Sequence, residues 1–469
     1  MMKKRLTAII LVLVLAAVSF VGCGNSTPAS QAPAASASSQ PAPESAQPAV
    51  TSETAVADAD SAAGEESNLI MFWWGNQTRN ERTQQVLEMF MAENPGITID
   101  GQFADGSEYW TRLATLAAGR TMPDVVQMEY TFLSQYARNS QLADLQGYVD
   151  SGAIDLSDTS EQIVQTGIVD GALYGICNGV TSFAMMYNKT LLDGAGIAVK
   201  DNMNLDEFRA LCKEVYAKTG YKTALTYGSG KSPDYLLFLL RAHGKKLYGD
   251  GAFEATDASE FNEFFALFED GINEGWHVDP SVYVERQQAS VEQDCLVYGS
   301  SPENMSWCAF YASNQITAMQ NAAPEGVEIA MTTFPSANPV ISNFLSPSQF
   351  FSISVDSPQA EAGAKLINYL TNSVECNNVL LGERGVPISQ VVAKAIAPNL
   401  DATAQRAVTF INDVITPNST TIDPPAPATA SQIRDMIDKL TEQVLYGEMT
   451  ASAASEQLFN EGNAILAAG

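Results

Sequence analysis

Residues 72–80 read Phe72-Trp73-Trp74-Gly75-Asn76-Gln77-Thr78-Arg79-Asn80. They follow a short apolar run at 69–71 and precede a segment in which Val86, Leu87, Phe90 and Met91 share one helical face. This pattern predicts a strand, a loop and a helix. Open α/β sheets place their ligands where strands end, so the loop is a candidate binding element. Alternation along the strand sends the two tryptophans to opposite faces, which predicts one ring in the core and one over a cleft.

The first 22 residues have the pattern of an export signal, because Lys3, Lys4 and Arg5 precede an apolar run at 6–21. The run ends in Phe20-Val21-Gly22-Cys23, which resembles a bacterial lipobox with Phe20 where an aliphatic residue is more usual. We expect 1–22 to be a lipoprotein signal peptide and Cys23 to carry acyl chains such as palmitate, which anchor an extracytoplasmic protein to the cell membrane. A cleaved signal with an incidental cysteine is the alternative.

The chain after Cys23 changes composition near residue 68. Residues 24–67 contain no aromatic residue and are dominated by Ser, Ala and Pro, so they cannot bury enough apolar surface to offset their chain entropy. We expect 23–67 to be the lipidated cysteine and a disordered tether. Residues 68–469 are long enough for two lobes with separate cores. The net charge of −29 argues against nucleic acid and against an anionic membrane surface as partners.

Five further cysteines are scattered along the chain without a paired motif: Cys177, Cys212, Cys295, Cys308 and Cys376. Their number is odd, so they cannot all pair within one chain; we expect buried thiols, with one disulfide as an open alternative. The two histidines, His243 and His277, are too far apart in sequence to suggest a metal site. The sequence therefore predicts neither a metal nor a cofactor.

Strand-like runs at 97–99, 124–128 and 183–188 alternate with helical patterns at 108–118 and 205–218, which predicts a mostly parallel α/β sheet. A short strand is also expected at 295–298. Aromatic rings stand beside carboxylates or amides at several expected strand ends, an arrangement that suits sugar rings and their hydroxyls. The residues concerned are Trp73, Trp74, Asn76, Asp105, Trp110, Glu129, Tyr130, Trp307, Tyr311 and Asn314.

The chain resembles the bacterial extracellular solute-binding proteins of ABC importers, in the carbohydrate-binding branch that includes maltose-binding protein. The resemblance covers nearly all of residues 68–469. Its most specific part is Asp170-Gly171-Ala172-Leu173-Tyr174-Gly175-Ile176 followed by Met186-Tyr187-Asn188-Lys189. It is supported by Met122-Pro123-Asp124-Val125-Val126, Pro347-Ser348-Gln349-Phe350-Phe351 and Glu383-Arg384-Gly385-Val386-Pro387, in that order along the chain.

The resemblance implies a two-lobed α/β fold, like that of periplasmic binding proteins, with a hinge between the lobes and the ligand clamped between them. It assigns residues 68–178 and 308–345 to the N-terminal lobe, and 179–307 and 346–469 to the C-terminal lobe. It places Trp74, Asn76, Glu129, Tyr130, Trp307 and Ser348 in the cleft. Arg79, Ser182, Tyr227 and Gln349, at neighbouring loops and crossings, complete the candidate set.

Three functions fit these features. The resemblance implies a monomeric, non-enzymatic lipoprotein that captures a di- or oligosaccharide and delivers it to the permease subunits of an ABC transporter. An exported glycoside hydrolase is the second, but it needs two carboxylates that face each other across the scissile bond, and the sequence sets no such pair. A surface adhesin or peptide binder is the third. The carboxylates Asp105 and Glu129 favour a neutral sugar, although Arg79 together with Lys231 could favour an acidic one.

Overall fold

The computed structural model describes residues 66–75, 77–225, 232–286 and 291–468. The expected signal peptide and tether lie outside the described residues. So do Cys23, Asn76, Tyr227 and Lys231.

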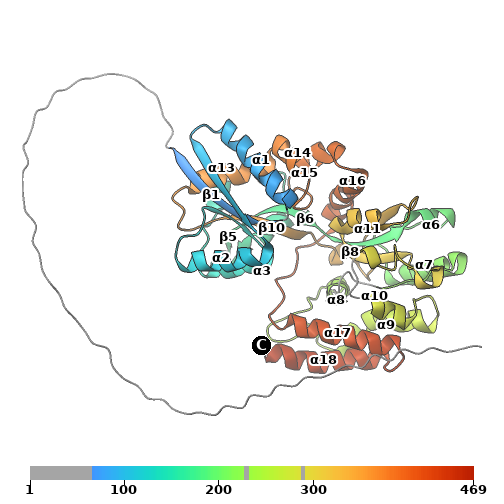
Figure 1. Ribbon diagram of the computed structural model, residues 1–469. Coiled ribbons are helices and arrows are strands. Elements are labelled where there is room, and N and C mark those ends of the chain that lie inside the picture. The colour runs from blue at the N-terminus through green and yellow to red at the C-terminus, as the bar shows by residue number, and fades with distance from the viewer. Residues whose placement is uncertain (1–65, 76, 226–231, 287–290, 469) are drawn as a thin grey trace, which may run out of the picture. The chain divides into compact units, whose positions relative to one another are not determined.

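The first sheet is built around β1 (Ser67–Trp74), which pairs in parallel with β2 (Ile97–Ala104) and with β3 (Val125–Met128). β10 (Ser346–Ile353) continues the sheet by pairing antiparallel with β3 and with β6 (Ile176–Thr181). The strand order is β2-β1-β3-β10-β6, and Figure 1 labels β1, β10 and β6 of this sheet. The predicted parallel sheet is therefore confirmed for the first three strands, and β10 is the antiparallel addition.

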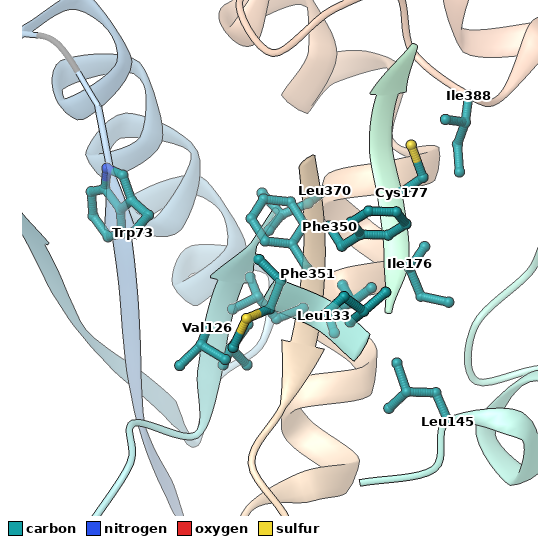
Figure 2. Close-up of a cluster of buried hydrophobic side chains, with 14 of the residues drawn as sticks. Trp73, Val126, Leu133, Leu145, Ile176, Cys177, Phe350, Phe351, Leu370 and Ile388 are labelled. Carbon is teal, nitrogen blue, oxygen red and sulfur yellow. The ribbon is translucent and has the colours of Figure 1, made fainter. Parts of the chain in front are cut away.

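A hydrophobic core joins this sheet to its helices. Phe350 and Phe351 on β10 are buried, and Figure 2 shows them with Leu133 between Val126 of β3 and Ile176 of β6. The two phenylalanine rings of β10 therefore pack against both neighbouring strands, β3 in the middle of the sheet and β6 at its edge. The helices of this part of the fold are α1 (Gln77–Glu93), α2 (Gly106–Ala118), α3 (Tyr130–Arg138), α4 (Gln146–Asp150), α5 (Glu161–Thr166), α13 (Ala360–Asn372), α14 (Val374–Leu380), α15 (Gln390–Ile396) and α16 (Ala402–Thr409), with the ribbon β4 (Ile168–Val169) and β5 (Ala172–Leu173).

The second sheet is antiparallel and has the order β8-β7-β9, from Cys308–Ala312, Phe183–Asn188 and Ile329–Thr332. Its core contains Phe208, Trp276 and Trp307, all fully buried. The helices around it are α6 (Lys189–Gly194), α7 (Leu205–Thr219), α8 (Ser232–Ala242), α9 (Asn262–Asn273), α10 (Pro280–Arg286), α11 (Ile316–Ala322), α12 (Pro339–Ser342), α17 (Ala430–Leu445) and α18 (Ala451–Ala467).

The chain passes from one sheet to the other at Ser182, which separates β6 from β7, and returns between β9 and β10. A third passage follows the π-helix Phe410–Ile415 and the short 3₁₀ helix Thr416–Asn418 and leads to α17. The three passages contact one another, because the Ser182 hydroxyl donates to Phe344 O over 2.8 Å and Phe344 forms a β-bridge with Thr420. The connection between the two sheets is thus a set of hydrogen-bonded crossing segments.

These pairings correct part of the predicted lobe boundaries. β8 and β9, within 308–345, pair with β7 in the second sheet, whereas β10, at the start of 346–469, belongs to the first. The prediction had these two assignments reversed, because pairing across distant sequence decides which sheet a strand joins. Ala430–Leu445 and Ala451–Ala467 form α17 and α18, which pack in the second core.

The structure also tests two smaller expectations. The strand expected at 295–298 is wrong, since these residues form turns after the short helix Val291–Gln293. The five described cysteines are free and buried, as the buried-thiol interpretation predicts. Burial raises the pKa of the Cys177, Cys212 and Cys376 thiols to about 12, so these groups stay protonated.

His277 is a buried histidine that the fold holds in its neutral form. Its Nε2 accepts from Leu225 N over 3.3 Å, so Nδ1 carries the proton that it shares with Val278 O at 2.9 Å. If Nε2 were protonated, its N–H would face the N–H of Leu225 in a buried environment, and neither donor would have an acceptor there. Desolvation accordingly lowers the His277 pKa from 6.5 to about 4.

We expect His277 to make the protein acid-sensitive. Because its pKa is lower in the folded state, the unfolded chain binds more protons between pH 6.5 and 4, and the free energy of unfolding falls as the pH falls through that window. Each unit of difference between the His277 pKa in the folded and unfolded states changes the free energy of unfolding by about 1.4 kcal/mol. Urea unfolding at pH 5 to 7 should show a shallower pH slope for H277Q than for the wild type. The exposed His243 provides the control, and an H277Q slope equal to that of H243Q would contradict this account.

Candidate functional site

The carboxyl ends of β1, β2 and β3 meet at one edge of the first sheet, since these neighbouring strands run parallel. Trp74 is the last residue of β1, Asp105 follows β2, and Glu129 and Tyr130 follow β3. These four residues therefore follow neighbouring strands at the same edge of the sheet.

An aromatic group covers this edge. The Trp74 ring lies 5.0 Å from Tyr109 and 5.2 Å from Trp110, and Trp110 stacks on Phe132 with ring centroids 4.1 Å apart. Tyr109 is fully buried and its hydroxyl donates to Gln127 O over 2.5 Å. Trp74 and Trp110 are half-buried, so they present aromatic surface at the edge of the sheet. Such surface suits the C–H face of a sugar ring.

The two tryptophans of β1 divide as the alternation predicts. Trp73 is fully buried, and its Nε1 donates to Asn80 Oδ1 over 3.0 Å. Its role in binding is therefore excluded, because the ring belongs to the core. The paired position Trp74 keeps an accessible face.

The carboxylates beside the rings differ in their surroundings. Glu129 is exposed and makes no side-chain cap for α3, yet neighbouring atoms desolvate it enough to raise its pKa. Asp105 is also exposed, but its Oδ1 accepts from Glu108 N over 3.1 Å and caps α2. Glu129 is thus the better placed to accept hydroxyls from a ligand, whereas Asp105 has a structural role as well.

Arg79 links the start of α1 to the last residue of β1. Its Nε lies 2.7 Å from Glu383 Oε2, and its Nη1 donates to Trp74 O over 3.2 Å. The side chains of this ion pair are only 13% and 11% exposed. Arg79, which the sequence offered as a partner for an acidic ligand, is therefore already paired with Glu383, whose carboxylate also lies 3.7 Å from Arg384 Nη1.

Several predicted ligand residues are wrong because the structure buries them against protein partners. Trp307 is fully buried, packs on Phe208 of α7 and donates through Nε1 to Thr223 Oγ1 over 2.8 Å. The Tyr311 hydroxyl donates to Asp294 Oδ2 over 2.9 Å, and desolvation raises its pKa. Ser182 is 2% exposed and serves the crossing described above.

The remaining candidates lie on or near the crossing strands. The Ser348 hydroxyl donates to Gly179 O over 2.7 Å and also contacts Arg384 O, so it joins β10 to β6. Gln349 Oε1 is buried and has no hydrogen-bond partner among the residues that the structure describes. Asn314 is exposed and lines a different cavity, of about 270 Å³, together with Arg82 and Asp401. The predicted ligand residues therefore lie in several separate parts of the fold and do not form one site.

The sequence interpretation missed an ion pair beside Tyr130. The Tyr130 hydroxyl donates to Asp423 O over 3.4 Å, and the Asp423 carboxylate pairs with Arg241 of α8. Desolvation raises the pKa of Asp423 and lowers that of Arg241. The one signal in the sequence is an arginine that directly follows the apolar run 236–240.

Among the residues that the structure describes, no group of three or more His, Cys, Asp and Glu side chains is placed to hold a metal ion. None of the helices described is both long and apolar enough to cross a membrane.

Comparison with known proteins places this geometry in a family. The family described as bacterial extracellular solute-binding protein matches residues 74–374. The curated relatives are 23% identical over 194 residues, 41% of this chain, and the chain spans about half the length of those relatives, 46%.

Three solved structures illustrate the similarity of fold. An extracellular solute-binding protein, family 1, from Alicyclobacillus acidocaldarius has a TM-score of 0.76 at 23% identity, covering 86% of this chain and 100% of that chain. A periplasmic oligogalacturonide binding protein from Yersinia enterocolitica has a TM-score of 0.69 at 22% identity, covering 85% of this chain and 98% of that chain. The sugar-binding protein MalE from Xanthomonas citri has a TM-score of 0.66 at 20% identity, covering 86% of this chain and 98% of that chain. The fold is therefore two-lobed, as predicted.

Proposed function

Because this chain belongs to the bacterial extracellular solute-binding proteins, we propose that it captures a di- or oligosaccharide between its lobes and delivers it to the permease of an ABC importer. The family is one of binding proteins and lies outside the cytoplasm, in agreement with the resemblance seen in the sequence. Saccharide binding is supported by the ligands named for the Yersinia and Xanthomonas proteins.

The observation that carries this proposal is the half-buried pair Trp74 and Trp110 beside Glu129 at the carboxyl edge of the sheet. A sugar ring offers apolar C–H faces for stacking and hydroxyls at its rim. The aromatic rings would take the faces and the carboxylate would accept the hydroxyls in charge-assisted bonds, roughly twice as strong as neutral ones.

The charge of the same edge favours a neutral ligand. A buried uronate would need a cation, since an unpaired buried carboxylate is costly. Arg79 is already paired with Glu383 at 2.7 Å, and Glu129 would repel a second carboxylate. The proposed ligand therefore differs from the oligogalacturonide of the Yersinia protein.

A glycoside hydrolase receives no support from this geometry. Hydrolysis requires a pair of carboxylates across the scissile bond, and Asp105 is engaged as the cap of α2. An adhesin would not require the polar and aromatic edge described above.

Calorimetry with neutral and uronic oligosaccharides, in the presence of a chelator, tests the proposal. We expect binding of neutral members only, and a loss of at least tenfold in affinity for W74A because the stacking surface is removed. The control is W307F, which alters a core tryptophan and should leave the affinity of the folded protein unchanged. Binding of only the uronic set, loss of all binding on chelation, or equal effects of the two variants would contradict it.

We also propose that Cys23 is lipidated and that residues 24–67 tether the binding body to the cell membrane. The support is the apolar run that ends at Cys23 and the composition of the segment that follows. More than one acyl chain gives stable anchoring, whereas a single chain is marginal.

Replacement of this cysteine should release the protein. In cells fed labelled palmitate, we expect the wild type to carry label and to sediment with membranes, and C23S to do neither. Label or membrane sedimentation retained by C23S would show that the anchor lies elsewhere.

A further inference from the structure

The segment at residues 383–387, which reads Glu-Arg-Gly-Val-Pro, has no part in the binding role proposed above. It follows α14 and lies against the crossing strand β6, because Val386 and Val180 exchange two backbone hydrogen bonds, at 3.0 and 2.8 Å. Gly385 adopts a φ of 113°, and a side chain there would lie 3.1 Å from the backbone of Val180. Glycine at this position therefore allows the segment to approach β6 closely.

The peptide group that follows Trp74 is bound on both sides. Arg79 Nη1 donates to Trp74 O over 3.2 Å, and Gln127 Nε2 donates to the same oxygen over 3.3 Å. The next N–H, that of Gly75, donates to Ala104 O over 3.3 Å. Since a carbonyl oxygen has two lone pairs, these donors can both be accommodated. The direction in which β1 ends, and with it the placement of the Trp74 ring, depends on these three hydrogen bonds.

Two consecutive residues of the segment hold the two side-chain donors. Arg79 Nε donates to both oxygens of Glu383, over 2.9 and 2.7 Å, and Arg384 Nε donates to Gln127 Oε1 over 3.0 Å. A guanidinium has donors and no acceptor, so Arg384 requires the amide oxygen of Gln127 on its own side. The NH₂ group of Gln127 is thereby directed at Trp74 O. Gln127 is fully buried and Arg384 is 6% exposed, so bulk water does not compete for this arrangement.

We infer that Glu383 and Arg384 are positioning residues for Trp74, and that their segment places the Trp74 peptide group according to the position of β6. The inference rests on the proposed function and deepens it, because Trp74 is the ring that would stack on the saccharide. Neither residue touches the ligand, since each acts through one donor, Arg79 or Gln127. A displacement of β6 therefore reaches the stacking ring through the segment and these two side chains.

Fluorine NMR of the full chain labelled with 5-fluorotryptophan tests this placement without a ligand. The chain has five tryptophans, so single replacements by phenylalanine assign the signals. Q127E keeps a partner for Arg384 but turns an acceptor toward Trp74 O, and we expect the Trp74 signal to move. Q127M, which removes the donor without adding a charge, should move it as well. G179A places a methyl group 2.4 Å from Arg384 O, so it displaces the segment from the side of β6 and should also move the Trp74 signal.

The matched control is T223V, which removes the acceptor of the Trp307 indole in the second core. It should move the Trp307 signal and leave the Trp74 signal in place. The Trp307 signal should in turn stay in place in the Gln127 and Gly179 variants. A Trp74 signal that does not move in the Gln127 variants, or in G179A, while T223V moves the Trp307 signal, would overturn the inference.

Calorimetry with neutral glucose, xylose and mannose oligomers extends the test to binding. We expect Q127E to lower the affinity about tenfold, because a displaced ring is no longer preorganised for the ligand, and T223V to match the wild type. Wild-type affinity of Q127E would overturn the positioning role and leave the proposed function standing. A moved Trp74 signal in a chain that binds none of these saccharides would overturn the proposed function and leave the positioning role standing.

Discussion

Arg384 links the aromatic edge of the first sheet to the crossing strand β6, with its buried guanidinium bound on the side of β3 and its backbone segment lying against β6. It is 6% exposed, and it donates to Gln127 Oε1 at 3.0 Å and to Thr83 Oγ1 at 2.9 Å. Desolvation lowers its pKa to about 9, so it stays charged near neutral pH and needs these acceptors. Gln127 in turn donates to Trp74 O. Val386, two residues after Arg384, pairs with Val180 of β6, and a side chain at Gly179 would meet Arg384 O at 2.4 Å.

This link explains how a binding event could be transmitted to the second lobe. The Trp74 loop, β3 and β6 are fastened together, so the first lobe would move as a whole. Hydrogen bonds also hold the crossing segments, because Arg241 of α8 donates to Ser342 O and to Thr421 O. Any motion between the lobes would therefore fall in the short backbone stretches between these hydrogen-bonded points, as in domain closure about a hinge.

The sequence could predict what depends on local pattern. The division between Trp73 and Trp74 follows from strand alternation, and the edge formed by Trp74, Asp105 and Glu129 follows from parallel strands. The sequence could not predict what depends on distant partners. Trp307 resembles Trp74 as a ring at a strand end, but Phe208, about 100 positions away, covers it. The pair Arg241 and Asp423 is 182 positions apart, and β10 joins a strand more than 200 positions earlier.

The central claim is that the two lobes close on a neutral saccharide. Small-angle scattering of the full chain, with and without a saturating oligosaccharide, measures this directly, because the segments outside the binding body contribute to both states. The account predicts a smaller radius of gyration with ligand. An unchanged radius of gyration, at a concentration where calorimetry shows the site to be filled, would contradict it.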